Sequence, residues 1–356
     1  MRVRFLVLSI LFVTTLLGQE PKEIGLKKIV EGGYAEKVLP LFRTQSDGES
    51  YTCLNNDRSM IVAMSYKTGK CVDTLFNARK ARECPFDDID GYEVSPNGYR
   101  ILVWRNSQVL YDNVFTAEYY DFDVRRNFIT PLSDTGGQLR APLFSPDGRM
   151  CAYVKDNDIW LRKFDFNTES PVTKDGKPDS ILNGCSDRLY GETFGDHPMM
   201  VWSSDSKMLS FVKLDIGDVG MLDYQVYEEG AYPKIRSIKS SLAGTVIPKA
   251  SIHSYSVDTR DIKELKIPAG SDYIPKLCLT KHSDQVAVMA FNRVQNVFHI
   301  HYLNPKSGVS RLILREEGKA YIEPDVLQTI EFLPDGFTFM SRITNSHRFS
   351  TTRKDM

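Results

Sequence analysis

The chain has 356 residues, of which 42% are hydrophobic and 26% are charged, and its formal net charge is −1. A chain of this size can bury a large core, either as one big β domain or as two smaller domains. The near-neutral balance provides no basic stripe for phosphates and no polybasic patch for a membrane surface, so no nucleic acid partner is expected.

The N-terminal segment, residues 1–18, has the pattern of a secretory signal peptide. Arg2 and Arg4 supply positive charge, residues 5–17 form an apolar core, and the small Gly18 ends the run. This run is shorter than the roughly 18 to 20 residues that a membrane-spanning helix requires. We therefore expect a secreted or periplasmic protein that is not inserted in a membrane after the signal is removed.

Tight-turn tetrapeptides recur along the rest of the chain. SPNG at 95–98 and SPDG at 145–148 are followed by SSDS at 203–206, KHSD at 281–284 and LPDG at 333–336. A short strand-like run follows each of them, which is typical of β-hairpins. Further strand and turn patterns after most of these runs indicate four strands per repeat.

The repeat predicts the fold class. Its period is near 50 residues in its first interval, from 95 to 145, and helical periodicity is nearly absent beyond residues 1–18. Four strands per repeat in an exported chain predict an all-β fold, a β-propeller of four-stranded blades.

No motif in the sequence predicts a catalytic, metal or cofactor site. The nucleophile elbow G-x-S-x-G, the zinc motif H-E-x-x-H, the phosphate-binding loop and the dinucleotide fingerprint are missing from it. His299 and His301 share one face of a strand, but no third ligand accompanies them, so we expect a structural or surface pair. Six cysteines allow 15 disulfide pairings. Cys151 and Cys278 lie in apolar runs and are expected as buried free thiols.

Two acidic stretches have the charge to bind an amine. Residues 215–248 form a long irregular segment, so Glu228 and Glu229 are expected in a solvated loop. DRLYGETFG at 187–195 is a polar stretch between two strand-like runs, and Glu192 supplies its central carboxylate. Alone, neither stretch identifies a ligand.

The order of several motifs resembles dipeptidyl peptidase IV and its bacterial relatives, in the prolyl oligopeptidase superfamily. DRLYGETFG stands where that family has D-W-V-Y-E-E-E-F, and WSSDS at 202–206 stands where it has W-S-P-D-G. NRVQN at 292–296, YIEP at 321–324 and TIEFLPDGFTFMS at 329–341 follow in the same order. The resemblance spans roughly residues 40–342, and NRxQN combined with the Y-x-E loop is its most specific part.

This resemblance implies an eight-bladed propeller over residues 19–343. In the family the propeller caps an α/β-hydrolase domain that carries a Ser-Asp-His triad, and the activity is that of a serine-type dipeptidyl peptidase. Here a polar tail, residues 344–356, follows. We therefore expect an incomplete last blade, no catalytic domain and no turnover by this chain alone.

The resemblance also implies where peptides bind. In the family the propeller gates access to the active site. Two of its glutamates bind the free N-terminal amine of the substrate, and an arginine contacts a substrate carbonyl. The glutamate pair falls on Glu192 and Thr193, so one carboxylate remains, near Tyr190, while Asp112 occupies the arginine position. Peptides with a free N-terminus are thus expected to bind weakly.

Three functions agree with these expectations. The first is a secreted propeller that is derived from a dipeptidyl peptidase and is inactive alone. The second is the non-catalytic half of a split proline-directed peptidase, with a separate hydrolase chain as its partner. The third is a propeller repurposed to bind peptides or proteins.

Overall fold

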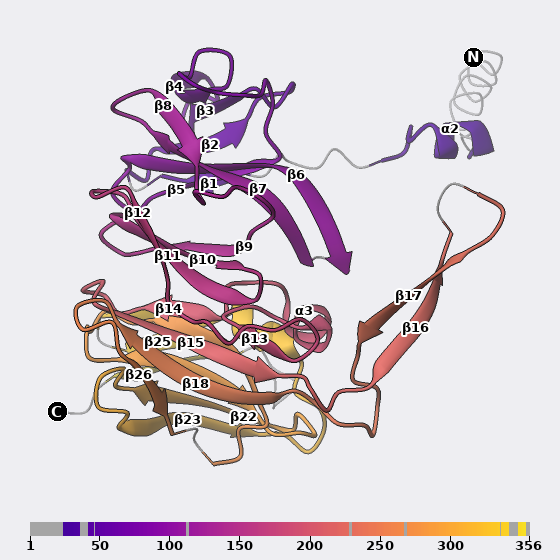
Figure 1. Ribbon diagram of the computed structural model, residues 1–356, viewed down its shortest axis with the longest axis vertical. Coiled ribbons are helices and arrows are strands. Elements are labelled where there is room, and N and C mark those ends of the chain that lie inside the picture. Colours follow the sequence, from indigo (N-terminus) through magenta and orange to yellow (C-terminus); the bar gives the residue numbers. More distant parts are fainter. Residues whose placement is uncertain are drawn as a thin grey trace, which may run out of the picture.

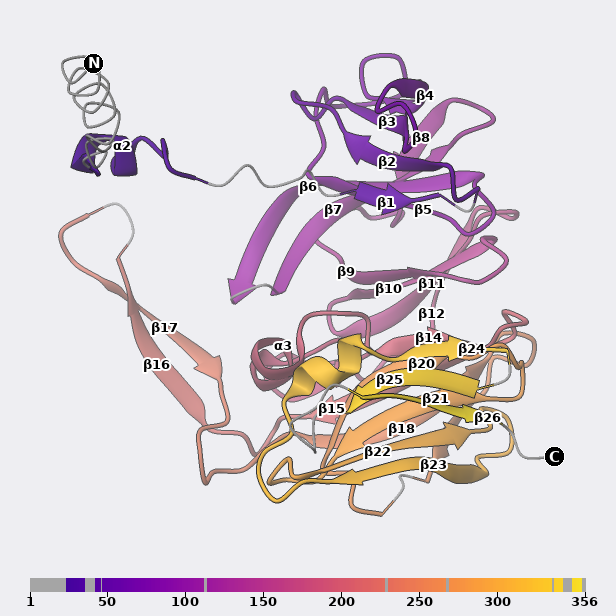
Figure 2. The same cartoon turned by 180° about the vertical axis from the view of Figure 1, so that it is seen from behind.

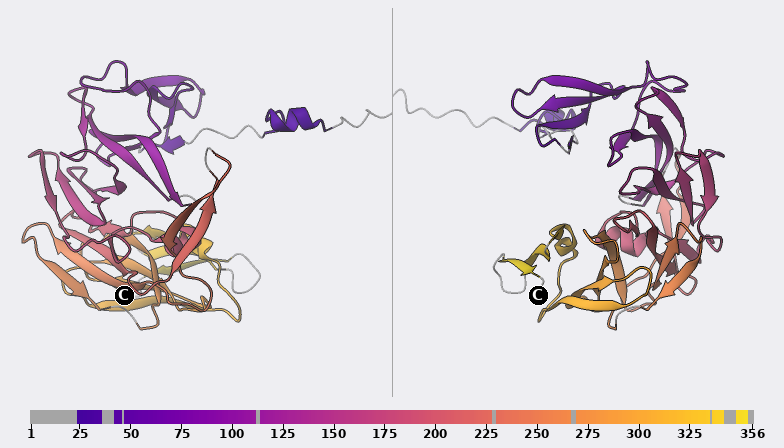
Figure 3. Two further views of the ribbon diagram at one scale, coloured as in Figure 1. Left: turned by 45° about the vertical axis from the view of Figure 1, so that its right-hand side comes forward. Right: turned by 90° about the vertical axis from the view of Figure 1, so that its left-hand side faces the viewer.

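The molecule is built almost entirely of β-sheets that follow one another around a curve (Figure 1, Figure 3). The computed structural model describes residues 24–35, 42–45, 47–111, 114–227, 230–266, 269–334, 336–341 and 348–353. The predicted signal peptide, residues 1–18, lies outside these ranges. Among the described helices, none combines the length and the apolar character needed to cross a membrane.

Three antiparallel four-stranded sheets form the first part of the array. The first contains β1 (Phe42–Thr44), β2 (Ser50–Leu54), β3 (Met60–Ser65) and β4 (Cys71–Asn77). The second contains β5 (Gly91–Val94), β6 (Arg100–Tyr111), β7 (Val114–Asp123) and β8 (Phe128–Pro131). The third contains β9 (Arg140–Phe144), β10 (Met150–Lys155), β11 (Asp158–Lys163) and β12 (Thr168–Pro171). The short helix α2 (Leu26–Val30) precedes them, with every residue exposed.

The predicted tetrapeptide turns connect strands as expected. In SPNG, between β5 and β6, the Ser95 hydroxyl accepts a hydrogen bond from the Arg100 N–H at 3.0 Å, and Gly98 has a φ of +72°. SPDG, between β9 and β10, repeats this turn with Gly148 at +67°. Glycine takes this left-handed conformation without the steric cost of a Cβ, so the turn chemistry of the sequence predicts the hairpins correctly.

The next sheet has five strands and carries a long hairpin. Its strands are β13 (Ile181–Asn183), β14 (Met200–Trp202), β15 (Met208–Asp215), β18 (Lys249–Ser256) and β19 (Ile262–Leu265). Between β15 and β18 the chain forms β16 (Met221–Val226) and β17 (Lys234–Lys239), which project away from the sheets (Figure 1). The segment 215–248, expected to be irregular, is therefore partly regular. None of the residues of β16 and β17 is buried, so this hairpin adds nothing to the core.

Two sheets complete the described array. The first contains β20 (Tyr273–Leu279), β21 (Val286–Phe291), β22 (Val297–Leu303) and β23 (Ser310–Glu317). The 3₁₀ helix η2 (Pro324–Gln328) then leads into β24 (Glu331–Leu333), β25 (Gly336–Ser341) and β26 (Arg348–Arg353). This last sheet has three described strands. The described residues thus contain six blade-like sheets, whereas the resemblance implies eight for a complete propeller.

Strand β26 lies inside the expected polar tail, residues 344–356. It pairs antiparallel with β25, from Ser341 opposite Arg348 to Gly336 opposite Arg353. Its sequence, RFSTTR, contains one apolar residue. This strand forms by backbone hydrogen bonding to the edge of the sheet, so its sequence shows no alternation of apolar and polar residues.

The core runs between neighbouring sheets. All six residues of β21 are buried, which is typical of a strand covered on both faces. All six cysteines of the chain lie in described residues and are free thiols. Cys151 and Cys278 are free thiols as expected, but only Cys151 is buried, whereas Cys278 is half-buried.

Candidate functional site

The stretch DRLYGETFG forms a short helix, α3 (Arg188–Phe194), between β13 and β14. The Asp187 side chain caps this helix by accepting a hydrogen bond from the Tyr190 N–H at 3.0 Å. Gly195 ends it with a φ of +88°, and its N–H donates to the carbonyl oxygen of Gly191 at 3.2 Å. An aspartate N-cap and a terminal glycine are helix signals. They mark a helix that the surrounding strand pattern obscures.

α3 lies beside η2 (Figure 2). Tyr190 and Phe194 attach it to the sheet formed by β20 to β23. Tyr190 is 2% exposed, and its hydroxyl oxygen accepts a hydrogen bond from the Ile274 N–H at 3.2 Å. Burial raises the pKa of this hydroxyl. The Phe194 ring lies 5.6 Å from the Tyr273 ring and 5.8 Å from the Phe291 ring. Tyr190, predicted as part of a remnant binding site, is therefore buried and anchors the helix.

Glu192 lies on the exposed side of α3. Its carboxylate accepts a hydrogen bond from Arg188 Nε, one helical turn earlier, and the two side chains are 32% and 26% exposed. Arg188 Nη1 also donates to the Ser240 hydroxyl at 3.4 Å. Arg188 stands where the resemblance has a tryptophan, and it already occupies part of the Glu192 carboxylate.

Of the other predicted binding positions, one lies in the described residues and three do not. Thr193 is half-buried next to Glu192. Asp112, Glu228 and Glu229 lie outside the described residues. However, Tyr111 ends β6 and Val114 begins β7, and the side chains of both residues lie against α3 at Gly191.

Gly191 is the point of closest approach between α3 and this hairpin. A Cβ atom added to Gly191 would lie 2.5 Å from Val114 Cγ2 and 3.3 Å from Tyr111 Cε2. The resemblance places the first of three consecutive glutamates at this position. A glutamate side chain does not fit this packing, so the glycine is a consequence of how closely the helix and the hairpin approach.

Replacing Gly191 by alanine is expected to destabilise the protein by up to about 2 kcal/mol. Alanine gains about 1 kcal/mol of helix propensity, but overpacking costs typically about 1 to 3 kcal/mol. Urea denaturation measures the difference. Gly220→Ala is the matched control, because Gly220 is exposed and no atom lies within 4 Å of its added Cβ. A Gly191→Ala protein more stable than the wild type by the full helix-propensity gain of about 1 kcal/mol would contradict the close approach.

Asp187 is the buried charge of the site. It is 3% exposed, and its Oδ2 atom has no hydrogen-bond partner among the described residues. Burial raises the pKa of this carboxyl to about 6, although hydrogen bonds from backbone N–H groups at the start of α3 lower it. At neutral pH the helix is thus capped by a carboxylate whose ionisation costs stability.

His299 and His301 form the structural pair that the sequence predicts. His299 Nε2 lies 3.1 Å from the Gly270 carbonyl oxygen, which only accepts, so this nitrogen carries the proton. His299 Nδ1 then accepts from His301 Nε2 at 3.0 Å. Burial and the neighbouring His299 lower the pKa of His301 to about 4. Within the described ranges, no group of three His, Cys, Asp or Glu residues is arranged to hold a metal.

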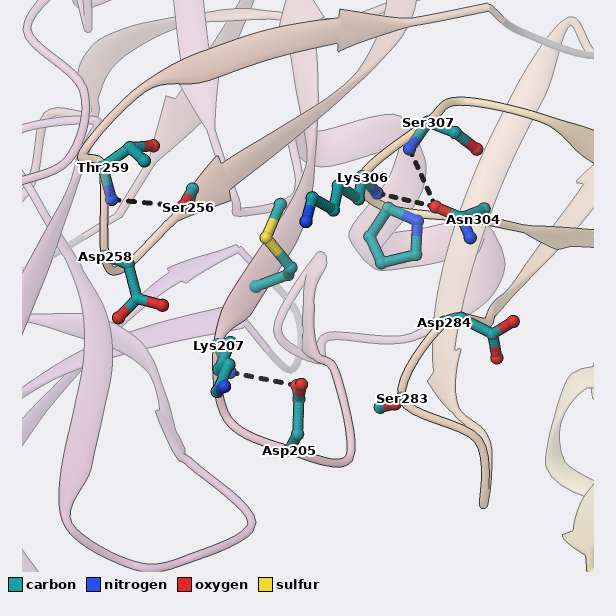
Figure 4. Close-up of a pocket in the computed structure, with 12 residues that line it drawn as sticks. Asp205, Lys207, Ser256, Asp258, Thr259, Ser283, Asp284, Asn304, Lys306 and Ser307 are labelled. Carbon is teal, nitrogen blue, oxygen red and sulfur yellow. Dashed lines mark hydrogen bonds between the residues drawn. The ribbon is translucent and has the colours of Figure 1, made fainter.

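A cavity of about 480 Å³ lies at the turns on the rim of two sheets (Figure 4). Three aspartates, Asp205, Asp258 and Asp284, line it together with Lys207 and Lys306. The cavity lies at the start of β15, whereas β13, which leads into α3, pairs with the end of that strand. It is therefore at the opposite end of the sheet from Glu192, and its mixed charges favour no one ligand class.

Comparison with known proteins places these features in one family. Residues 95–352 match the family described as the dipeptidyl peptidase IV (DPP IV) N-terminal region. This stretch includes α3, Glu192 and the β6–β7 hairpin. The crystal structure of Porphyromonas gingivalis dipeptidyl peptidase 4 is similar, with a TM-score of 0.89 and 40% sequence identity. The similarity covers 94% of this chain and 48% of that chain.

Curated relatives agree with this assignment. Probable dipeptidyl-aminopeptidase B of Emericella nidulans is 26% identical over 333 residues, which is 86% of this chain and 35% of the relative. Prolyl endopeptidase FAP of Mus musculus is 25% identical over 289 residues, 79% of this chain and 37% of the relative. The chain thus spans little more than a third of the length of these relatives. With a family match over most of its length and the propeller architecture, the chain belongs to the dipeptidyl peptidase IV N-terminal family.

Proposed function

We propose that this chain is the exported propeller part of a dipeptidyl peptidase IV-type system and that Glu192 binds the N-terminal ammonium group of a peptide. One observation carries the proposal: a carboxylate stands on the exposed side of a helix that is capped at both ends and anchored in the core. The sequence pattern of residues 1–18 supports export. The mature protein is then expected to lack these residues, which its intact mass would show.

The charges around Glu192 favour weak binding. A hydrogen bond to a charged group contributes about 1.5 to 3 kcal/mol. Thr193 offers no charge where the family has its second glutamate, so one such contribution is missing. Arg188 already donates a hydrogen bond to the Glu192 carboxylate. Replacing this hydrogen bond by one from a peptide ammonium group therefore adds little binding free energy. The proposed ligand is therefore a peptide amine held mainly by one carboxylate.

Hydrolysis belongs, in this proposal, to an α/β-hydrolase domain on the same polypeptide or on a separate one. The 356 residues contain no G-x-S-x-G elbow to present a serine nucleophile. We expect the purified 356-residue chain to release no product from an X-Pro-chromophore substrate. Clear turnover by this chain alone would contradict that part of the proposal.

Replacing Glu192 by glutamine is expected to weaken binding of a free-amine X-Pro peptide roughly 10- to 100-fold, because the charge-assisted hydrogen bond is lost. The measurement is the Kd from calorimetry or from fluorescence of a labelled peptide. The N-acetylated peptide is the ligand control, and we expect it to bind equally to both proteins. Arg188→Gln is the protein control, since it frees Glu192 and is expected to maintain or strengthen binding. An unchanged Kd in Glu192→Gln would exclude Glu192 as the amine site.

A further inference from the structure

A buried arginine joins the two ends of the α3 segment. Arg140 begins β9, and its side chain is 11% exposed. Its Nη2 donates to the carbonyl oxygen of Ser186 at 3.2 Å and to the Ser186 hydroxyl at 3.1 Å. The same Nη2 lies 3.6 Å from Asp196 Oδ1, to which the Ser186 hydroxyl donates at 2.8 Å. Ser186 precedes the N-cap of α3 and Asp196 follows the C-cap, so one guanidinium holds the chain on both sides of the helix.

The Ser186 carbonyl also connects α3 with the β6–β7 hairpin. The Tyr111 hydroxyl donates to this oxygen at 3.1 Å. Burial raises the pKa of Tyr111, so its hydroxyl remains a donor at neutral pH. Tyr111 is the last residue of β6 and precedes Asp112, the position of the family arginine. Arg140 and Tyr111 therefore share one acceptor at the junction of the helix and the hairpin.

The backbone around Arg140 is bent at this point. β9 pairs with β10 through Leu143 opposite Ala152 and Arg140 opposite Val154, so β9 contains one extra residue, a β-bulge. Ala141 has a φ of +50°, a left-handed conformation that costs an alanine about 1 kcal/mol or more. Bulges redirect side chains and are frequent beside functional sites. The strained bulge immediately follows the residue that holds α3.

A simple stabilising role explains this arginine poorly. Arg140 Nε has no hydrogen-bond partner among the described residues, and the same is true of Asp187 Oδ2. Burying a charge with incomplete hydrogen bonding is costly, and an apolar residue of similar volume often stabilises a fold equally well. The geometry instead suits a positioning role, because one nitrogen of the side chain contacts the chain on both sides of the helix.

We propose that Arg140 is a positioning residue of the Glu192 site, which sets the Glu192 carboxylate relative to Tyr111 and Val114 of the β6–β7 hairpin. The inference rests on the proposed function of Glu192. Arg140 lies behind α3 and acts through Ser186 and Asp196, without contact to the peptide. Because binding groups must be held to within a fraction of an ångström, a looser helix loses affinity for the peptide amine.

A double-mutant cycle between Arg140→Gln and Glu192→Gln tests the inference. We expect Arg140→Gln to weaken binding of the free-amine X-Pro peptide roughly tenfold when Glu192 is present, and less than about twofold in the Glu192→Gln protein. Its cost in urea denaturation is expected to be the same in both proteins. Arg140→Lys keeps the charge but not the planar fork, so we expect it to restore part of the affinity.

If the Arg140→Gln protein does not fold, Tyr111→Phe takes its place in the double-mutant cycle with Glu192→Gln. It removes one hydroxyl from the shared Ser186 acceptor, and we expect a twofold to fivefold loss of affinity, again dependent on Glu192. If Glu192→Gln weakens binding but the Arg140 and Tyr111 effects persist without Glu192, the inference is overturned and the proposed function stands. If Glu192→Gln alone leaves the Kd unchanged, the proposed function is overturned together with the inference.

Discussion

Replacing Phe194 by alanine is expected to lower the free energy of unfolding by about 3 to 5 kcal/mol, the usual range for a buried phenylalanine. Phe194 is 7% exposed and is the last residue of α3. Its ring contacts Tyr190 in its own helix and Tyr273 and Phe291 in the next sheet. Truncation leaves a cavity between the helix and the sheet that rigid strands cannot fill. The loss is therefore expected near the upper end of what single substitutions produce.

Urea denaturation followed by tryptophan fluorescence measures this effect. Phe166→Ala is the matched control, because the same side chain is removed from a site that is 75% exposed. That control is expected to change stability by less than about 0.5 kcal/mol. A loss below about 1 kcal/mol in Phe194→Ala would show that α3 does not depend on this aromatic contact.

Replacing Asp187 by asparagine is expected to stabilise the protein by up to about 3 kcal/mol above pH 6 and to have little effect near pH 4. Burial raises the pKa of Asp187 to about 6 from an ordinary value of 3.8, and each pKa unit corresponds to about 1.4 kcal/mol. Asparagine caps helices as well as aspartate does, so the hydrogen bond to the Tyr190 N–H is kept.

The sign follows from proton linkage. The native protein binds the Asp187 proton more tightly than the unfolded chain does, so stability falls as pH rises from about 4 to 6. Asparagine removes this loss, and the stability difference between variant and wild type should grow over that window and then level off. Asp121, whose pKa burial also raises to about 6, titrates in both proteins, so its effect cancels in the difference. A difference that is constant from pH 4 to pH 8 would contradict the buried charge.

Much of the fold can be predicted from the sequence because its signals are local. In turns such as SPNG and SPDG, glycine and proline restrict the backbone within four residues, and the strands beside them alternate over short distances. The order of motifs, from DRLYGETFG to NRVQN and YIEP, identifies the family without structural information. Glu192 is also predicted as the remaining carboxylate, and the structure places it on an exposed helix surface.

Other elements form for reasons that are weak in the sequence. In β16 the apolar Leu222, Tyr224 and Val226 do alternate with polar residues. β17 lacks such alternation and β26 is held by backbone pairing, so a search for hydrophobic alternation misses these two strands. For α3, the caps Asp187 and Gly195 are visible in the sequence, but a seven-residue helix between strands has too few turns to show a helical period.

The site itself was decided by contacts between residues far apart in the chain. Gly191 is required by Val114, which lies 2.5 Å from where its Cβ would be. Arg140 donates a hydrogen bond to Ser186, which is 46 residues away in the sequence. Tyr111 donates to the same residue, which is 75 residues away from it. A propensity or a spacing cannot report such contacts, because they exist only after the sheets have packed. The sequence by itself determined the propeller, the family and one surface carboxylate, whereas tertiary packing decided which side chains hold that carboxylate in place.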